Sequence, residues 1–86
     1  MTYYLGNLYN YKSPNTLARV MLLDITTETY MYSNPATIYH FKILQIIRNI
    51  IPNYKQFEII KLTLSEANFL IRKSDQYVYT ITDLYT

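Results

Sequence analysis

Histidine is the side chain best suited to move a proton near neutral pH, and this chain contains one, His40. A general base needs a hydrogen-bonding group that orients it, and on a helix that group lies three or four residues away. Those positions hold Ala36, Thr37, Ile43 and Leu44, none of which is acidic. An orienting carboxylate must therefore come from elsewhere in the fold. We interpret His40 as a surface or boundary residue rather than a catalytic one.

The other residue types that commonly form reactive or binding sites are either missing, as cysteine is, present once, as glycine is, or spread along the chain, as the acids are. The chain has no cysteine, which excludes thiol nucleophiles, disulfides and cysteine-rich zinc or iron–sulfur sites. Its one glycine, Gly6, cannot form the glycine-rich loop that cradles a phosphate. The six acids show no spacing typical of a carboxylate pair: Asp24, Glu28, Glu58, Glu66, Asp75 and Asp83. We therefore expect no enzymatic activity, no metal site and no cofactor.

Composition indicates a single folded domain over residues 1–86. Hydrophobic residues make up 50% of the chain and charged residues 16%, whereas ordinary domains carry about 25% charge. Intrinsic disorder needs the opposite balance. The net charge of +2 is too small to indicate a polyanionic partner by itself, and the eight basic residues are spread along the chain.

Composition and hydropathy also suggest a source and a compartment. Residues with AT-rich codons, such as Tyr, Ile, Asn and Lys, are abundant, so we expect a virus, phage or mobile element. The longest nearly apolar stretch, Ile38–Ile51, is interrupted by polar residues and is too short to span a bilayer. The first residues carry no basic-then-apolar signal. These features predict a cytoplasmic protein, in the host cytoplasm if the chain is viral.

Runs of aromatic and β-branched residues, separated by proline and asparagine, predict five strands. They are Thr2–Tyr9, Leu17–Asp24, Glu28–Tyr32, Phe57–Leu62 and Tyr77–Thr82. We expect a loop at Tyr11–Thr16 and a hairpin turn at Ile25–Thr27, although neither Asn-Gly nor Asp-Gly marks that turn.

Two helices are expected between the later strands. Asn34 suits the N-cap of the first, Pro35 suits its first position, and helical periodicity continues to Ile50 before Pro52. A short second helix, Glu66–Ser74, follows a possible Ser65 cap. The order β-β-β-α-β-α-β predicts an α+β fold, a mostly antiparallel sheet with both helices on one face.

The first expected helix carries more apolar surface than one sheet face can cover. Its apolar residues occupy more than half of its circumference, with Ile38, Phe41 and Ile46 outside the central stripe. Either the second helix covers this surplus, or another chain does. We favour cover by another chain, because isologous homodimers commonly bury such a surface.

Eleven tyrosines add a second candidate surface. Strand alternation places Tyr30 and Tyr32 on one face, and Tyr77 and Tyr79 on another. These side chains are either half-buried sheet residues or exposed aromatic platforms for a protein or for nucleobases. In the nucleic-acid alternative, the platforms act together with four basic residues: Lys55, Lys61, Arg72 and Lys73.

Parts of the chain resemble the DUF1874 family of small viral and mobile-element proteins, which includes ring nucleases that destroy cyclic tetra-adenylate. Tyr3-Tyr4-Leu5-Gly6-Asn7 is similar to the opening strand of that family, and Ala36-Thr37-Ile38 with Phe57–Leu62 is similar to its central helix and strand. The Gly-His motif of the family falls near Ser33-Asn34, where no histidine stands. Its Arg-Leu-x-Glu-Gly motif has no counterpart around Lys73–Val78. The resemblance thus implies a fold or a binding role without the nuclease activity.

Our leading hypothesis from sequence is a small non-enzymatic interaction protein that inhibits or regulates a host factor. Its expected partner is a second copy or a host protein, bound through the apolar and tyrosine-rich surface. The alternative is a module that binds nucleic acid or a cyclic oligonucleotide, including a divergent anti-CRISPR related to ring nucleases. No membrane partner is expected.

Overall fold

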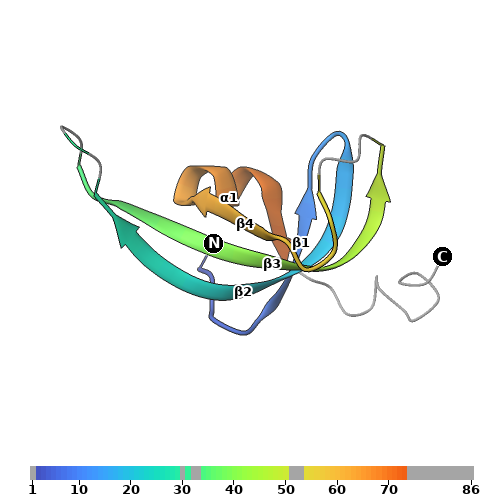
Figure 1. Ribbon diagram of the computed structural model, residues 1–86, viewed down its shortest axis with the longest axis horizontal. Coiled ribbons are helices and arrows are strands. Elements are labelled where there is room, and N and C mark those ends of the chain that lie inside the picture. The colour runs from blue at the N-terminus through green and yellow to red at the C-terminus, as the bar shows by residue number, and fades with distance from the viewer. Residues whose placement is uncertain (1, 30, 32–33, 51–53, 74–86) are drawn as a thin grey trace.

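The computed structural model of this chain describes residues 2–29, 31, 34–50 and 54–73, which form an antiparallel sheet and a short helix. The elements in chain order are β1 (Leu8–Lys12), β2 (Thr16–Glu28), β3 (Ala36–Asn49), β4 (Ile59–Thr63), α1 (Leu64–Leu70) and β5 (Ile71–Lys73). The strand order is β4-β3-β2-β1-β5, and every neighbouring pair is antiparallel. The chain therefore meanders from β1 to β4 (Figure 1) and returns through α1, which brings β5 beside β1 in the strand order.

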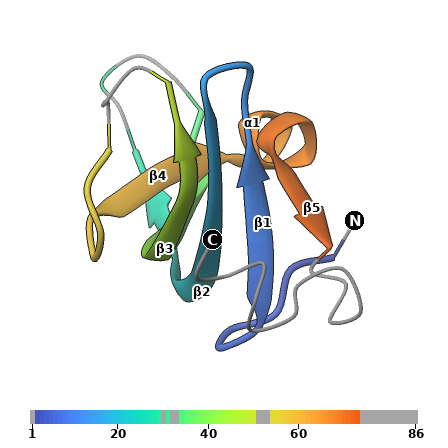
Figure 2. The ribbon, with the colours of Figure 1, turned by 90° about the vertical axis from the view of Figure 1, so that its right-hand side faces the viewer.

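The short return through α1 requires the sheet to curl. A seven-residue helix spans about 10 Å, at 1.5 Å per residue. The edges of a flat five-stranded sheet lie about 19 Å apart, at roughly 4.8 Å per step. Because α1 joins the two edge strands directly, the sheet bends until those edges approach each other. Figure 2 shows the result, with β3, β2, β1 and β5 side by side and β4 turned across the back towards α1.

The long strands β2 and β3 bend at three irregularities in their pairing. The register shifts between Leu17 and Ala18, between Arg19 and Val20, and between Leu22 and Asp24. At each shift one strand carries an additional residue, which is Ile47 or Leu44 in β3 and Leu23 in β2. Such bulges kink a strand and increase its twist, so they supply the curvature that the fold needs.

The core lies on the concave side of the sheet, under α1. Its largest fully buried side chains are Phe41, Leu22, Ile43, Ile71, Val20 and Thr16. An aromatic cluster fills one end, where the Tyr3 ring packs edge-to-face on Tyr9, Tyr39 and Phe41 with centroids 5.4–6.0 Å apart. The Tyr3 hydroxyl donates a hydrogen bond to Asn68 Oδ1 of α1 at 2.9 Å. The N-terminal segment therefore closes the core against the helix.

The predicted α+β fold with two helices is wrong, because residues 36–49 form β3 and not a helix. Their side chains are rich in β-branched and aromatic residues, which lose rotamer freedom in a helix but pack well on a pleated surface. Tyr39, Phe41 and Ile43 face the core from alternate positions, and pairing with both β2 and β4 satisfies the backbone. The cap signal at Asn34-Pro35 was thus overridden by tertiary pairing.

Several other boundaries differ from those expected. The hairpin turn predicted at Ile25–Thr27 is absent, because β2 continues unbroken to Glu28. The expected strand Thr2–Tyr9 begins instead at Leu8, after a turn in which Gly6 has φ 80°. The short helix expected at Glu66–Ser74 lies at Leu64–Leu70, and Ile71–Lys73 form β5 instead. Thr63 caps the helix in place of Ser65, and its Oγ1 accepts the Glu66 amide. The last expected strand, Tyr77–Thr82, lies outside the described residues.

Candidate functional site

Alternation along the strands separates an inner from an outer face of the sheet. Inner side chains are buried: Tyr9, Tyr11, Ala18, Val20, Phe41, Ile60 and Leu62 are between 0% and 6% exposed. The residues between them therefore point to the opposite, convex side. Most of the basic residues of the chain lie on this outer face.

We define the outer basic face as Lys12, Arg19, Lys42, Arg48 and Lys61. Direct cross-strand partners share a face, and the register places these residues in adjacent rows. One row runs from Lys12 through Leu17 to Arg48, and the next contains Arg19 opposite Gln45. A third has Lys42 between Met21 and Ile59, and a fourth has His40 opposite Lys61. The basic side chains thus come from four different strands.

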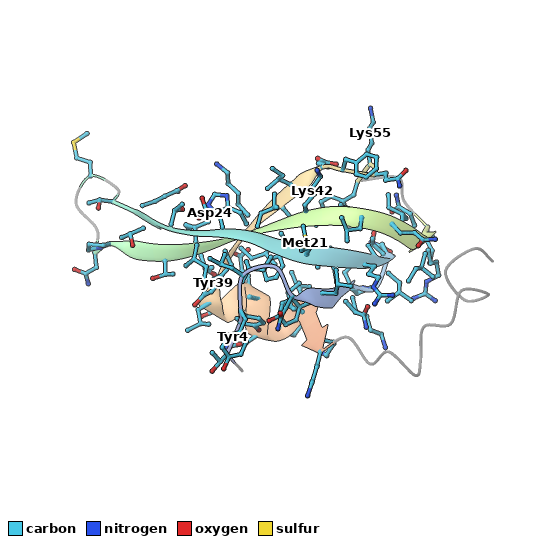
Figure 3. The ribbon with its side chains drawn as sticks, turned by 90° about the horizontal axis from the view of Figure 1, so that it is seen from below. Tyr4, Met21, Asp24, Tyr39, Lys42 and Lys55 are labelled. Carbon is cyan, nitrogen blue, oxygen red and sulfur yellow. The ribbon has the colours of Figure 1, made fainter. Side chains whose placement is uncertain are left out.

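Lys42 lies beside an exposed aromatic ring. Its Nζ atom is 5.4 Å from the centroid of Phe57, which precedes β4 and is 62% exposed. This distance is within the range of a cation–π contact. Figure 3 shows Lys42, Lys55 and Asp24 on one side of the β2–β3 ribbon, with Tyr4 and Tyr39 on the other. Lys55, from the loop before β4, therefore extends the outer basic face.

Two of the acids near this surface lie towards one end of it, while Glu58 belongs to the same turn as Lys55 and Phe57. Asp24 and Glu28 belong to the part of β2 beyond the Leu23 bulge, near the tip of the β2–β3 hairpin. The Asp24 carboxylate accepts the amide hydrogen of Ile25 at 2.8 Å. Basic residues outnumber Glu58 at the other end, where β1, β2 and β3 lie together with the β4 edge.

His40 lies at the border between these two regions. Its Nε2 shares a hydrogen bond of 2.7 Å with Thr26 Oγ1, and Asp24 is its cross-strand partner in the register. A carboxylate from another strand thus stands near His40, a possibility that helical spacing did not reveal.

Two of the three apolar residues expected to bind a partner are buried. Ile38 and Phe41 are 5% and 0% exposed, and Ile46 is half-buried against the core. The chain itself therefore covers Ile38 and Phe41, whereas Ile50 of the same segment is 65% exposed. The tyrosines of the same expected surface, Tyr30, Tyr32, Tyr77 and Tyr79, lie outside the described residues.

The four basic residues of the nucleic-acid alternative are all exposed but are not brought together as one group. Lys61 and Lys55 join the outer basic face. Arg72 pairs with Asn10, which also pairs with Arg19, so it lies in the same outer row, and its Nη1 donates to the carbonyl oxygens of Phe69 at 2.8 Å and Ile71 at 3.1 Å. Lys73 pairs with Tyr9, an inner-face residue, so it stands on the other side of the sheet.

Sequence reasoning missed five site residues: Lys12, Arg19, Lys42, Arg48 and Phe57. The signal for Lys42 was present, because His40 and Lys42 alternate with Tyr39, Phe41 and Ile43 at the period of a strand. Lys12 and Arg48 join the face only through cross-strand registry, which the sequence does not encode locally.

Three features of the described residues concern metal binding, membrane crossing and shifted pKa values. Within residues 2–29, 31, 34–50 and 54–73, no group of three or more acidic or histidine side chains is placed to hold a metal ion. In that same part of the chain, no helix has the length and apolar character needed to cross a membrane. The raised pKa values belong to Tyr3 and Tyr11, whose burial on the inner side disfavours the charged phenolate.

Comparison of this chain with protein-family models, with characterised proteins and with solved structures gives no match. The resemblance to the DUF1874 family therefore stays a prediction.

Proposed function

We propose that this protein is a non-enzymatic module that binds nucleic acid through the outer basic face. The observation that carries the proposal is the registry of five basic residues from four strands on one convex surface. Binding to phosphates needs cations that are arranged along a surface, and the total charge of the chain matters less than this arrangement. A cytoplasmic location and a viral or mobile-element origin, both expected from composition, are part of this proposal.

The character of the neighbouring side chains also supports it. Gln45, opposite Arg19, offers an amide group on an outer position of the sheet, and such groups contact phosphate and sugar oxygens. Met21 and Ile59 provide apolar contact area beside Lys42 in the same row. A mixture of cations, hydrogen-bonding groups and apolar surface is typical of sheets that bind nucleic acid.

Fluorescence anisotropy with labelled oligonucleotides tests the proposal. A labelled strand of about 20 nucleotides should bind with an affinity that falls as salt rises from about 50 to 200 mM. If four or five cations contact phosphates, log K against log salt should have a slope of about −3 for a single strand. Failure to bind any strand or duplex at the lower salt concentration would remove the proposal.

A pair of charge reversals gives the matched control. Lys61→Glu and Lys73→Glu make the same chemical change at exposed positions on opposite faces. Lys61→Glu should weaken binding about 5- to 10-fold at low salt and flatten the salt slope. Lys73→Glu should change the affinity less than about twofold. Equal losses would mean that total charge, and not the outer basic face, controls binding.

A second candidate is binding to a protein partner or to another copy, as our sequence hypothesis held. The observation that favours it is a group of exposed apolar side chains where the N-terminal segment meets β2. Leu5, Leu8 and Leu23 are 59%, 36% and 41% exposed. Hydrogen bonds from the Gly6 amide to the Leu22 carbonyl and from the Leu22 amide to the Asn7 carbonyl join these two stretches. Apolar groups clustered in this way often mark contact surfaces.

Sedimentation equilibrium distinguishes this candidate from the first. A dimer that dissociates in Leu23→Lys but persists in Lys61→Glu would support association through the apolar group. A monomer at all concentrations up to about 100 μM excludes a dimer with a dissociation constant in the low micromolar range.

A further inference from the structure

Phe57 is displayed by a turn that holds its backbone firmly. The turn spans Lys55 to Glu58 and connects the β3 side of the sheet to β4. The Phe57 amide donates to the Ile43 carbonyl at 2.7 Å, and the Ile43 amide donates to the Glu58 carbonyl at 2.9 Å. The Lys55 amide donates to Glu58 Oε2 at 2.9 Å, which closes the turn from inside. Phe57 therefore lies at a position set by β3, despite its location in a connection.

The conformation of Phe57 is one that phenylalanine rarely adopts. Its φ is 68°, in the left-handed region, where the side-chain Cβ approaches the backbone and glycine or asparagine is the usual residue. The ring gains little burial in return, since 62% of the residue is exposed. Strain of this kind, at a residue whose side chain faces solvent, points to a role for the ring outside the folded core.

The surroundings of the ring match one class of ligand. Lys42 Nζ lies over the ring, Lys55 starts the same turn, and Lys61 lies two residues beyond Ile59 on the outer side of β4. An exposed aromatic ring among cations combines the two contacts that an unpaired nucleotide needs, stacking for its base and charge for its phosphates. In a duplex the bases are stacked on one another, and a surface ring has no free base face to cover.

We propose that the ligand of the outer basic face is single-stranded nucleic acid, with one unpaired base stacked on Phe57. Lys42, Lys55 and Lys61 contact the phosphates on either side of that base. This inference rests on the proposed function, because it names the ligand class of the same surface.

Three variants separate stacking from charge and from general apolar contact. Phe57→Leu keeps an apolar side chain but removes the aromatic face, and Phe57→Tyr keeps that face. Phe69→Leu is the matched control, because Phe69 is 72% exposed but belongs to α1 rather than to the outer face. Circular dichroism and thermal unfolding of each variant confirm that binding is compared between folded proteins.

The test is fluorescence anisotropy with a labelled oligothymidine strand, a mixed-sequence strand and the corresponding duplex. We expect tighter binding to both single strands than to the duplex. Phe57→Leu should weaken single-strand binding roughly 5- to 100-fold and leave the slope against log salt unchanged, because base stacking carries no charge. Phe57→Tyr and Phe69→Leu should stay within about twofold of the parent.

The outcomes distinguish the two proposals. If the parent protein binds neither strands nor duplex, the proposed function fails and this inference fails with it. If the parent binds with the expected salt dependence but prefers duplex, or if Phe57→Leu binds single strands like the parent, stacking on Phe57 is excluded while the basic surface stands.

Discussion

The hydroxyl of Tyr3 and the side-chain oxygen of Asn68 lie 2.9 Å apart, although 65 positions separate the two residues in the chain. Tyr3 is 6% exposed and belongs to the aromatic cluster with Tyr9 and Phe41, whereas Asn68 stands on α1. This hydrogen bond links the N-terminal segment to the helix that joins the two sheet edges. It therefore helps to hold the curled sheet closed.

We predict that Tyr3→Phe lowers the free energy of unfolding by about 1 kcal/mol, because it removes this hydrogen bond and keeps the ring. Urea unfolding of Tyr3→Phe, Asn68→Ala and the double variant measures the coupling between the two residues, with an expected value of about 1 kcal/mol. Tyr4→Phe is the control, since Tyr4 is 60% exposed. Additive effects of the two substitutions would show that the contact contributes nothing to stability.

Tyr11 predicts how the protein responds to alkali. Burial, together with the hydroxyl of Tyr54 at 3.3 Å, raises the pKa of Tyr11 from its ordinary value of 10.0 to about 12. The native state thus holds this proton more tightly than the unfolded chain does. The resulting stability is complete below pH 10, where Tyr11 is neutral in both states, and is lost as the pH rises towards 12.

Urea unfolding at pH values from about 8 to 11 measures this effect in the parent and in Tyr11→Phe. The free energy of unfolding of the parent should fall above pH 10, and the fall should be smaller in Tyr11→Phe. Tyr3, whose pKa is also raised, mainly by burial, accounts for part of the decline that remains. The same slope in both proteins would mean that Tyr11 titrates normally in the folded state.

Local patterns in the sequence located some elements correctly and misassigned the longest one. The apolar run before the short helix forms β4, and the helix itself exists. Ile60, Leu62 and Ala67 from these two elements are all buried in the core, so the local pattern of apolar residues was enough to locate both. Residues 36–49 satisfied both a helical and a strand pattern, since the eight apolar residues among these fourteen are spaced so that they fit either period. Bulges at Leu44 and Ile47 disturb the strict alternation that would have identified a strand.

The candidate site was less predictable than the fold, because it depends on registry between distant segments. Lys61 was recognised as a basic residue, but its position opposite His40 requires the pairing of β3 with β4. The pairing of β5 with β1 places Arg72 in the outer row of Arg19, and its guanidinium donates to carbonyl groups at the end of α1. The strain at Phe57 arises from the geometry of the turn, and the sequence has no glycine or asparagine at this position that would indicate a positive φ.

The cap of α1 offers a direct test of one correction. Thr63 Oγ1 accepts the Glu66 amide at 3.3 Å, and Glu66 Oε1 accepts the Thr63 amide at 3.0 Å, which together form a capping box. Thr63→Ala should therefore lower the free energy of unfolding by about 1 kcal/mol. Ser65→Ala, at the position expected from sequence, should change it by no more than about 0.5 kcal/mol. Chemical denaturation of both variants decides between the two caps, and a larger loss in Ser65→Ala would contradict the structure.

The backbone of Phe57 gives a prediction about stability that is independent of any ligand. At φ 68° asparagine is tolerated better than phenylalanine, whereas a β-branched side chain is the worst choice. Phe57→Asn should be at least as stable as the parent, because relief of strain offsets the lost contact with Lys42. Phe57→Val should be less stable than Phe57→Asn by about 1–2 kcal/mol.

Thermal and urea unfolding of these two variants and of the parent check this order. Phe57→Asn should also lose the affinity for single strands, since it removes the ring. Stability that is kept while binding is lost identifies a residue retained for its surface role, as strained functional positions require. If Phe57→Asn proves less stable than the parent by more than about 1 kcal/mol, the ring supports the fold, and the inference that strain at this turn serves binding is wrong.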